Sequence, residues 1–201
     1  GASSALAGRA FSGGPDSVAE HVAASLRGLR AGRVGATAKH FPGLGAANAN
    51  TDDAPVTIDA TRAELDAREL PPFRAAVRER VPLVMAGHAL YPALDNRRIA
   101  SQSPAVLERL LRRELGFRGV VVTDSIEADA VLSRSGVAPA AERSVAAGAD
   151  LVLLTGSGSW NLAFPRLLER ARRSPAFRAR VGESAARVLA LKRSLGLREG
   201  S

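Results

Sequence analysis

Expected strands of this sequence end in side chains that can do chemistry. Lys39 and His40 follow one apolar run, and His88 and Asp124 follow two others. In parallel α/β architectures ligands bind beyond the carboxyl ends of the strands, so these side chains are candidates for a single site. A carboxylate there can act as a nucleophile or exchange a proton, and an ammonium or imidazole group can hydrogen-bond a ligand. Each also has a plainer interpretation, since a lone His after a strand is often structural and Asp124 can cap the helix that follows.

Short apolar runs alternate along the chain with longer segments of helical spacing. Strands are expected at 34–38, 82–86, 119–123 and 150–154, and helices at 15–31, 61–80, 104–115, 137–147, 161–173 and 175–195. Pro71 and Pro72 are expected to interrupt the second of these helices. Because the strand runs are continuously apolar rather than alternating, each is predicted to be buried on both faces of a parallel sheet. Four such strand–helix units fit a doubly wound sheet or part of a TIM barrel.

The amino-acid composition excludes several classes of protein for this chain. The 201 residues are 46% apolar and 24% charged, which suits a single folded domain over 1–201, and no apolar run reaches the ~18 residues of a membrane span. The absence of cysteine excludes a disulfide framework and a thiolate metal site. The net charge of +8 comes from 28 basic residues, all but two of them Arg. They are scattered over outer helix faces without alternating aromatic residues, so nucleic-acid binding is not expected.

The stretch ATAKHFPGLG at 36–45 resembles a signature of glycoside hydrolase family 3, in its β-N-acetylhexosaminidase branch. Further similar stretches lie at 81–92 (VPLVMAGHALYP), 115–131 (LGFRGVVVTDSIEADAV), 147–156 (AGADLVLLTG), 187–197 and 8–11. The resemblance covers essentially the whole chain. It implies a (β/α)8 TIM barrel and a retaining glycosidase, which needs neither a metal ion nor an organic cofactor.

The resemblance also implies roles for particular residues. Asp124 matches the nucleophile, which attacks the anomeric carbon and forms a covalent glycosyl–Asp intermediate. Lys39 and His40 match the pair that hydrogen-bonds sugar hydroxyl groups, and Arg9 matches a substrate-contacting Arg. His88 falls on a family position near the substrate. We therefore expect the Asp124 carboxylate and the Lys39 ammonium to converge on one sugar ring.

One departure from the family concerns the acid/base group. The family branch takes it from an Asp-Ser-His triplet in the loop after its KHFPGHG signature, and here that triplet falls on Asn50, Thr51 and Asp52. Both the His and the carboxylate that orients it are replaced. Asp52 or Asp53 could act as the acid instead, because carboxyl groups serve this role in many glycosidases. The alternative is a turn-forming loop with no catalytic task.

The second departure is in length. A complete barrel takes about 250 residues and eight strands, and the four strands expected here match the last four of the family. The chain begins with Gly1 and is expected to be the C-terminal half of a barrel from a longer protein, with two open sheet edges. The missing N-terminal half, or a second copy of the chain, is expected to cover those edges.

Three classes of function are consistent with these observations. The first is a hydrolase of terminal β-linked N-acetylhexosamine or a related sugar. The second is a catalytically impaired carbohydrate-binding or scaffold fragment of the same fold, because the acid/base His and the N-terminal half are missing. The third is an unrelated phosphate- or nucleotide-binding protein, for which the turn at 155–158 (TGSG) is a candidate although it lacks the P-loop Lys. By analogy alone, an extracellular or cell-envelope location is slightly favoured over a cytoplasmic one.

Overall fold

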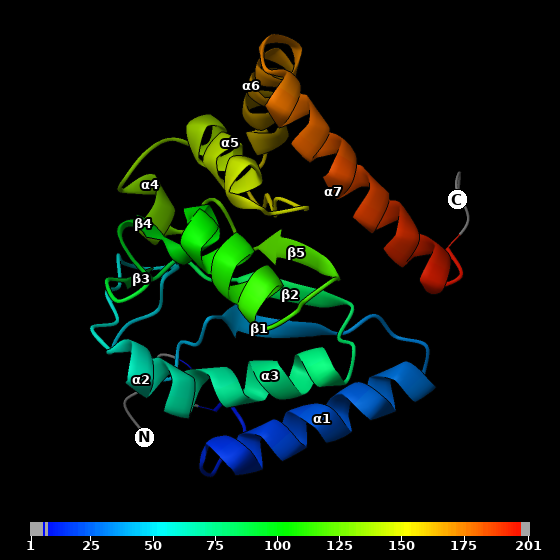
Figure 1. Cartoon of the computed structure of the whole chain (residues 1–201). Coiled ribbons are helices and arrows are strands. Elements are labelled where there is room, and N and C mark those ends of the chain that lie inside the picture. The colour runs from blue at the N-terminus through cyan, green and yellow to red at the C-terminus, as the bar shows by residue number, and fades with distance from the viewer. Residues whose placement is uncertain (1–5, 7, 198–201) are drawn as a thin grey trace.

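A computed structural model describes residue 6 and residues 8–197, and a parallel sheet runs through its centre (Figure 1). In this part of the chain the sheet contains β1 (Thr37–Phe41), β2 (Leu83–Ala86) and β5 (Val120–Thr123), in the order β1-β2-β5. Thr37 pairs with Leu83, which pairs on its other side with Val120. The lateral order thus follows the chain order, as in a TIM barrel, whereas the strand order of a doubly wound sheet reverses at its switch point.

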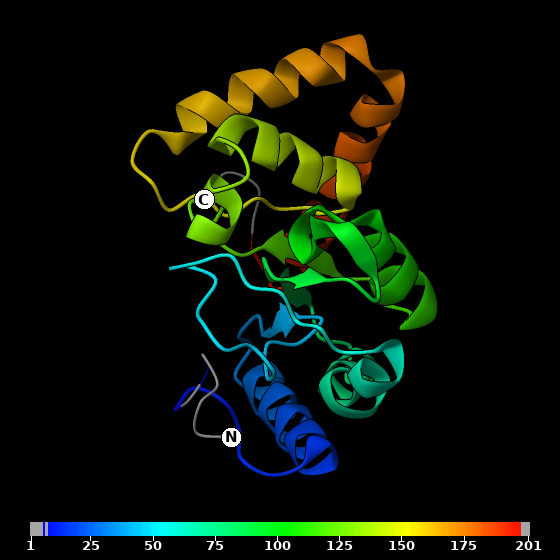
Figure 2. The same cartoon turned by 90° about the vertical axis from the view of Figure 1, so that its left-hand side faces the viewer.

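Helices pack around the sheet, from β1 at one edge to β5 at the other (Figures 1 and 2). They are α1 (Pro15–Ala31), α2 (Arg62–Glu64), η1 (Leu65–Glu69), α3 (Leu70–Arg78), η2 (Ala100–Gln102), η3 (Ala105–Glu114), α4 (Asp129–Leu132), α5 (Val137–Ala147), α6 (Ser159–Arg173) and α7 (Pro175–Ser194). In Figure 1, α1 and α3 lie side by side below the sheet, and α5, α6 and α7 lie above it. η1 and η3 are π-helical, with hydrogen bonds from residue i+5 to residue i. The core lies between the sheet and these helices and includes the fully buried Leu65, Val84 and Leu107.

The strand expected at 34–38 begins and ends later along the chain, as β1. Its start is delayed because Arg33 adopts a left-handed backbone conformation (φ 56°), so the chain is still turning away from α1. Its end is extended because Phe41 pairs with β2. Lys39 and His40 therefore lie within the last part of the strand and not beyond it.

The strand expected at 150–154 is reduced to a single parallel bridge between Leu151 and Val122. The ladder is irregular there because the N–H of Leu153 donates to the side-chain hydroxyl of Thr123 (3.0 Å) instead of to a strand carbonyl. The segment occupies the place of a strand beside β5, and Leu151 keeps 37% of its surface exposed.

Pro71 and Pro72 do not interrupt the helix expected at 61–80, which corrects that prediction. α2, η1 and α3 follow one another without a break. Both prolines fall in the first turn of α3, a position that tolerates proline. The π-turn η1 precedes them, and the N–H of Leu70 closes it on the carbonyl of Leu65.

Two elements at the carboxyl ends of the strands were not predicted. They are the β-hairpin formed by β3 (Leu90–Tyr91) and β4 (Asp95–Ile99), and the short helix α4. Together with the loop 42–60 they gather at the left of Figure 1 and face the viewer in Figure 2. These elements and the strand ends therefore surround the place where the predicted site residues lie. By contrast, the helices expected at 15–31 and 137–147 are found with those bounds.

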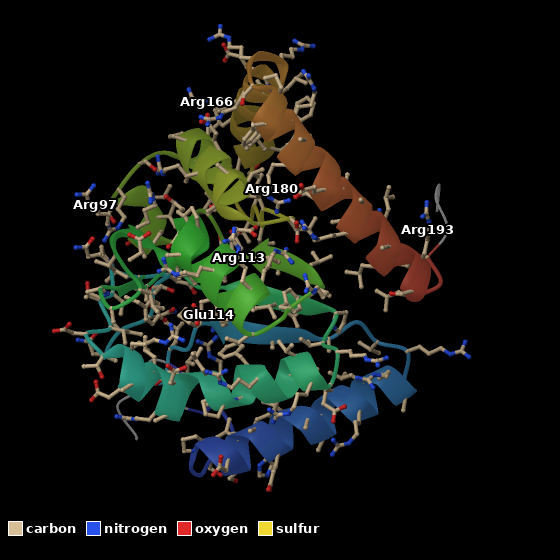
Figure 3. All side chains as sticks on the ribbon, viewed as in Figure 1. Arg97, Arg113, Glu114, Arg166, Arg180 and Arg193 are labelled. Atoms are coloured by element: carbon tan, nitrogen blue, oxygen red, sulfur yellow. The ribbon has the colours of Figure 1, made fainter. Side chains whose placement is uncertain are left out.

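Arginine side chains lie mainly on the outer faces of the helices and loops. Figure 3 shows Arg97 and Arg193 directed outward on opposite sides of the molecule, and both are exposed. Other arginines join neighbouring helices, as Arg166 of α6 does by pairing with Glu142 of α5. The positive charge is thus spread over solvated surfaces and over ion pairs between helices.

Candidate active site

The loop that follows β1 is held in place by two side chains. The Tyr91 hydroxyl donates to the carbonyl of Gly43 (2.5 Å), and the Glu69 carboxylate accepts from the N–H of Gly45 (3.2 Å). Gly43 has a φ of 136°, and a Cβ there would lie 2.3 Å from Oε2 of Glu69, so the position requires glycine. Burial raises the pKa of Tyr91 well above its usual range, so its hydroxyl remains a donor. These contacts fix the direction in which the chain leaves β1.

His40 and Asp124 approach each other across the carboxyl end of the sheet. Nε2 of His40 lies 3.3 Å from Oδ2 of Asp124, although the two residues come from β1 and from the end of β5, on either side of β2. His40 is buried, while Asp124 keeps 18% of its side chain exposed. Burial lowers the pKa of His40 and the Asp124 carboxylate opposes this shift, with a net pKa below the ordinary value. The imidazole is therefore neutral at neutral pH. The peptide bond between Lys39 and His40 is cis.

Further charged side chains surround His40. After burial and Asp124, the cations of Lys39 and Arg9 lower the pKa of His40, and the carboxylate of Asp52 raises it. Because such electrostatic effects act over short distances in salt solution, these side chains share one neighbourhood with His40. Lys39, Arg9 and Asp52 are all exposed, so none of them is sealed in the interior.

Lys39, His40 and Arg9 also line a cavity of about 960 Å³ on the free side of β1. Its other walls come from α1 and α3 and include the apolar side chains of Leu26 and Phe73. The volume is in the range of small-molecule sites. The walls of this cavity therefore combine cationic and imidazole groups with apolar side chains.

His88 lies beneath the site and is fully buried. Its Nε2 lies 2.8 Å from the carbonyl oxygen of Ser125, and its Nδ1 lies 2.8 Å from Oγ of Ser101. A carbonyl can only accept, so Nε2 carries the proton and Ser101 donates to Nδ1. Burial lowers the pKa of His88, which keeps the ring neutral. Both ring nitrogens thus contact protein groups, and one of them holds the residue that follows Asp124.

The loop expected to supply an acid is packed against α4. The carbonyls of Thr51 and Asp52 accept from the N–H groups of Ala130 (3.2 Å) and Asp129 (3.0 Å). Oδ2 of Asp52 accepts from the side-chain amide of Asn50 (3.2 Å). The carboxylate of Asp52 raises the pKa of both His40 and His88, after the larger effects of burial and Asp124. Asp53 follows in the same turn and is also exposed.

Glu127 is a residue of the site that sequence reasoning did not identify. Its carboxylate accepts from the backbone N–H groups of Thr155 (3.1 Å) and Gly156 (3.0 Å) and from the hydroxyl of Ser125 (2.9 Å). Burial alone would raise the pKa of Glu127, but hydrogen bonds from Ser159 and from these groups lower it to about 2. The N–H groups at the start of the glycine-rich turn thus bind a carboxylate of the protein itself, which removes the main support for a phosphate site there.

In residues 6 and 8–197, no group of three or more His, Cys, Asp or Glu side chains is arranged so that it could hold a metal ion. Among the helices of the same residues, none has the length and apolar character needed to cross a membrane.

Comparison with known proteins assigns the family. The model described as "Glycosyl hydrolase family 3 N terminal domain" matches residues 2–191. A beta-hexosaminidase of Stenotrophomonas maltophilia (strain R551-3) is 39% identical over 150 residues, which are 75% of this chain and 44% of that protein. The chain thus spans less than half the length of this curated relative.

Solved structures agree with this assignment. The glycoside hydrolase family 3 beta-N-acetylglucosaminidase from Paenibacillus sp. str. FPU-7 matches with a TM-score of 0.91 and 36% identity, over 98% of this chain and 38% of that one. The beta-N-acetylhexosaminidase from Beutenbergia cavernae DSM 12333 matches with a TM-score of 0.86 and 36% identity, over 92% of this chain and 54% of that one. The resemblance that rests on the KHFPG and VVVTD stretches is confirmed, and the chain belongs to glycosyl hydrolase family 3, whose N-terminal domain it matches over residues 2–191.

Proposed function

We propose that this chain carries the catalytic site of a retaining glycosidase that removes terminal β-linked N-acetylhexosamine or a related β-linked sugar. The observation that carries the proposal is the 3.3 Å approach of His40 to Asp124, with Lys39 and Arg9 near the same imidazole. The choice of sugar is supported by the names of the relatives, a beta-hexosaminidase and two enzymes that act on N-acetylated hexosamines.

Asp124 is the proposed nucleophile. Its N–H donates to the carbonyl of Ala86 (2.9 Å), and its Oδ1 accepts from the N–H of Ser125 (2.9 Å), which leaves Oδ2 beside His40. In the first step Oδ2 attacks the anomeric carbon, the bond to the leaving oxygen breaks, and an acid protonates that oxygen. A glycosyl ester forms on Asp124. In the second step the same acid/base group deprotonates a water molecule, which attacks the anomeric carbon and releases the carboxylate.

The proposed sugar-binding groups are Lys39, His40 and Arg9. Lys39 and Arg9 supply charged N–H donors to sugar hydroxyl groups, and such charge-assisted bonds are stronger than neutral ones. The neutral His40 supplies an Nε2–H that faces the nucleophile. For His88 we propose a supporting role, because its Nε2–H is bonded to the carbonyl of Ser125.

Asp52 is the proposed acid/base group. Its exposed carboxylate lies close enough to His40 and His88 to act on their charge, and its backbone is fixed to α4. Asp53, which is also exposed, is the alternative in the same turn. Removal of a general acid lowers the rate by about 100- to 10,000-fold, so an Asp52→Asn protein should lose that much if Asp52 has this role.

We also propose that the single domain over 1–201 forms the last four units of a (β/α)8 barrel. Two observations support this proposal. The strands β1, β2 and β5 are parallel and adjacent in that order, with Leu151 bridged to β5, and the chain covers only part of the length of its relatives. An N-terminal half-barrel or a second copy of the chain would then cover the outer edges of β1 and of the 151–154 segment. Size-exclusion chromatography of the isolated chain tests this proposal, because a stable monomer would count against open edges.

A second candidate function is carbohydrate binding without hydrolysis. Two observations favour it. The carboxylate of Asp52 accepts a hydrogen bond from Asn50, and Asp52 itself occupies the triplet position that holds the acid/base His in the family branch. In that case the cationic groups near His40 would bind the sugar, and the leaving oxygen would receive no proton.

Hydrolysis of an aryl β-N-acetylglucosaminide by the full-length protein tests the two functions. We expect a burst of aryl alcohol followed by steady turnover, and a loss on the order of 10,000-fold in kcat for Asp124→Asn. Asp129→Asn is the matched control, because this aspartate is exposed on the nearby α4. Binding of N-acetylglucosamine without turnover would instead support the second function. Full activity of the Asp124→Asn protein would refute the assignment of the nucleophile.

A further inference from the structure

Ser125, the residue after the proposed nucleophile, is held at three of its polar groups. Its N–H donates to Oδ1 of Asp124 (2.9 Å), and its carbonyl accepts from Nε2 of His88 (2.8 Å). Its hydroxyl donates to Oε2 of Glu127 (2.9 Å) and lies 2.6 Å from the hydroxyl of Thr155. His88 reaches Ser125 from the loop after β2, whereas Glu127 lies two residues beyond Ser125 in the same loop.

Glu127 also joins this strand end to the next loop along the chain. The two oxygens of its carboxylate accept from the backbone N–H groups of Gly156 and Thr155, respectively. Hydrogen bonds from N–H groups to a carboxylate are charge-assisted and roughly twice as strong as neutral ones. The approach is close, because a Cβ on Gly156 would lie 2.6 Å from Oγ of Ser159 and 3.0 Å from the Glu127 side chain. One carboxylate thus fixes both the loop after β5 and the turn 155–158.

From these contacts we infer that Glu127 is a positioning residue for Asp124. It holds Ser125 and the turn 155–158, and through Ser125 it fixes the orientation in which Asp124 presents Oδ2 to His40. The inference rests on the proposed function, because Glu127 affects catalysis only if Asp124 is the nucleophile. Glu127 itself does not exchange protons with the substrate, since its oxygens are occupied by donors from the protein and it stays ionised in the range in which enzymes work.

The variant that tests this role is Glu127→Gln. The side chain keeps its length, but one oxygen becomes an NH2 group, which cannot accept from Thr155 or Gly156. The matched control is Glu142→Gln. Glu142 is another mostly buried carboxylate, but its ion pairs are with Arg166 and Arg170 of α6 and not with the strand ends. Thermal unfolding of both variants shows whether their losses of stability are comparable.

The first measurement is steady-state hydrolysis of the aryl glycoside. We expect Glu127→Gln to lower kcat by about 100-fold, the effect of misplacing a reacting group by about 1 Å, with little change in KM. Glu142→Gln should leave kcat unchanged. A loss of equal size in both variants, or none in Glu127→Gln, would overturn the inference.

The second measurement does not need activity. The protein contains three His residues, so labelling histidine with 15N gives few ring signals to assign. The signal of the His88 Nε2–H, which is bonded to Ser125, should shift in Glu127→Gln and stay in place in Glu142→Gln. An unchanged signal in Glu127→Gln would refute the positioning role. If the wild-type protein hydrolyses no glycoside but the His88 signal still shifts in Glu127→Gln, the positioning role is supported and the proposed function is refuted.

If Glu127→Gln does not fold, Ser125→Ala takes its place. This substitution removes the hydroxyl between Glu127 and Thr155 and keeps the backbone contacts of residue 125. The inference then requires a smaller fall in kcat in the same direction and a shift of the same His88 signal. Wild-type values for both would contradict it.

Discussion

Replacing Asp150 with Asn should destabilise the protein strongly. The side chain of Asp150 is fully buried, with 0% exposed, and lies at the opposite end of β5 from Asp124. It is bonded to Arg112 (2.6 Å), Arg180 (2.8 Å) and Arg187 (3.0 Å), and it accepts from the N–H of Val121 (2.9 Å). Arg180 and Arg187 belong to α7, and Figure 3 shows Arg180 where this helix meets the body of the protein. One carboxylate thus binds α7 to η3 and to β5.

The size of the expected loss in the free energy of unfolding depends on the buried arginines that would lose their carboxylate partner. Only 8% of the Arg112 side chain is exposed, and its burial lowers its pKa while the Asp150 carboxylate opposes that shift. Removing one partner of a buried ion pair costs about 3–5 kcal/mol, because the other charge stays buried without compensation. The Asn oxygen still accepts one hydrogen bond, so we expect the lower value. A loss of about 3 kcal/mol is large beside a typical stability of about 5–15 kcal/mol.

Urea denaturation followed by circular dichroism measures the free energy of unfolding of both proteins. A loss of about 3 kcal/mol corresponds to a fall in Tm of about 6–12 °C for a domain of this size. Glu114→Gln is the control, because Glu114 pairs with Arg62 at the surface and such pairs contribute about 0–1 kcal/mol. A loss below about 1 kcal/mol for Asp150→Asn would refute the argument from buried charge. If Asp150→Asn does not fold, Arg187→Gln takes its place, because the Arg187 side chain is 29% exposed and its loss is milder. Arg187→Gln should lower the free energy of unfolding by about 1 kcal/mol, and an unchanged value would contradict the argument.

Three further predictions concern the loop after β1 and the site. Gly43→Ala should lower the free energy of unfolding by about 1–3 kcal/mol, because of its positive φ and the contact with Glu69. Gly28→Ala in the last turn of α1 should instead raise it by about 0.5–1 kcal/mol. Equal changes in the free energy of unfolding for the two variants, measured by urea denaturation, would show that the contact between residue 43 and Glu69 is unimportant. Tyr91→Phe leaves the buried Gly43 carbonyl without its donor and should cost about 1–3 kcal/mol, measured as a fall in Tm. The pKa of Glu127 is about 2 in the folded protein against an ordinary 4.5, so its contribution to stability is complete above pH 4.5 and is lost as the pH falls toward 2. The full shift would correspond to about 3 kcal/mol, and solvent screening reduces the expected loss to about 1–2 kcal/mol. Glu127→Gln should lack this loss in acid, and parallel stability curves for the two proteins would refute the prediction.

Position along the chain was sufficient to predict that His40 and Asp124 lie at the same edge of the sheet. Each follows or ends an apolar run, and the carboxyl ends of parallel strands meet at one edge. In the structure Nε2 of His40 lies 3.3 Å from Oδ2 of Asp124. The roles of these residues in catalysis remain predictions.

Glu127 could not be found by the same reasoning. Its partners Thr155 and Gly156 lie 28 and 29 residues further along the chain, and no periodicity relates them. The sequence offered a glycine-rich turn, which was considered for phosphate binding, and an acidic residue after a strand. Only the fold shows that the N–H groups of that turn bind this carboxylate.

Helix ends were predicted better than strand ends. α1 begins at Pro15 and ends before Gly32, and α5 ends before Gly148, because proline and glycine act locally on the backbone. The bounds of β1 depend instead on the pairing of Phe41 with another strand, which apolar runs do not reveal. For the same reason the hairpin at Leu90–Ile99 was expected as a loop.

The wide turn η1 lets the chain vary in length at this point. A π-turn contains one residue more than the α-helical turn it replaces, so a chain with one residue fewer here can close the turn as α-helix and keep both flanking segments in place, whereas a deletion within α3 would rotate everything before it by about 100°. The two sides of the turn are attached to different neighbours, since Arg62 bonds to Glu114 (2.7 Å) and Glu69 bonds to Gly45 (3.2 Å). A single deletion inside η1 that spares Glu69 should therefore keep both attachments. Homologues that share both contacts should differ in length across this segment by no more than that one residue.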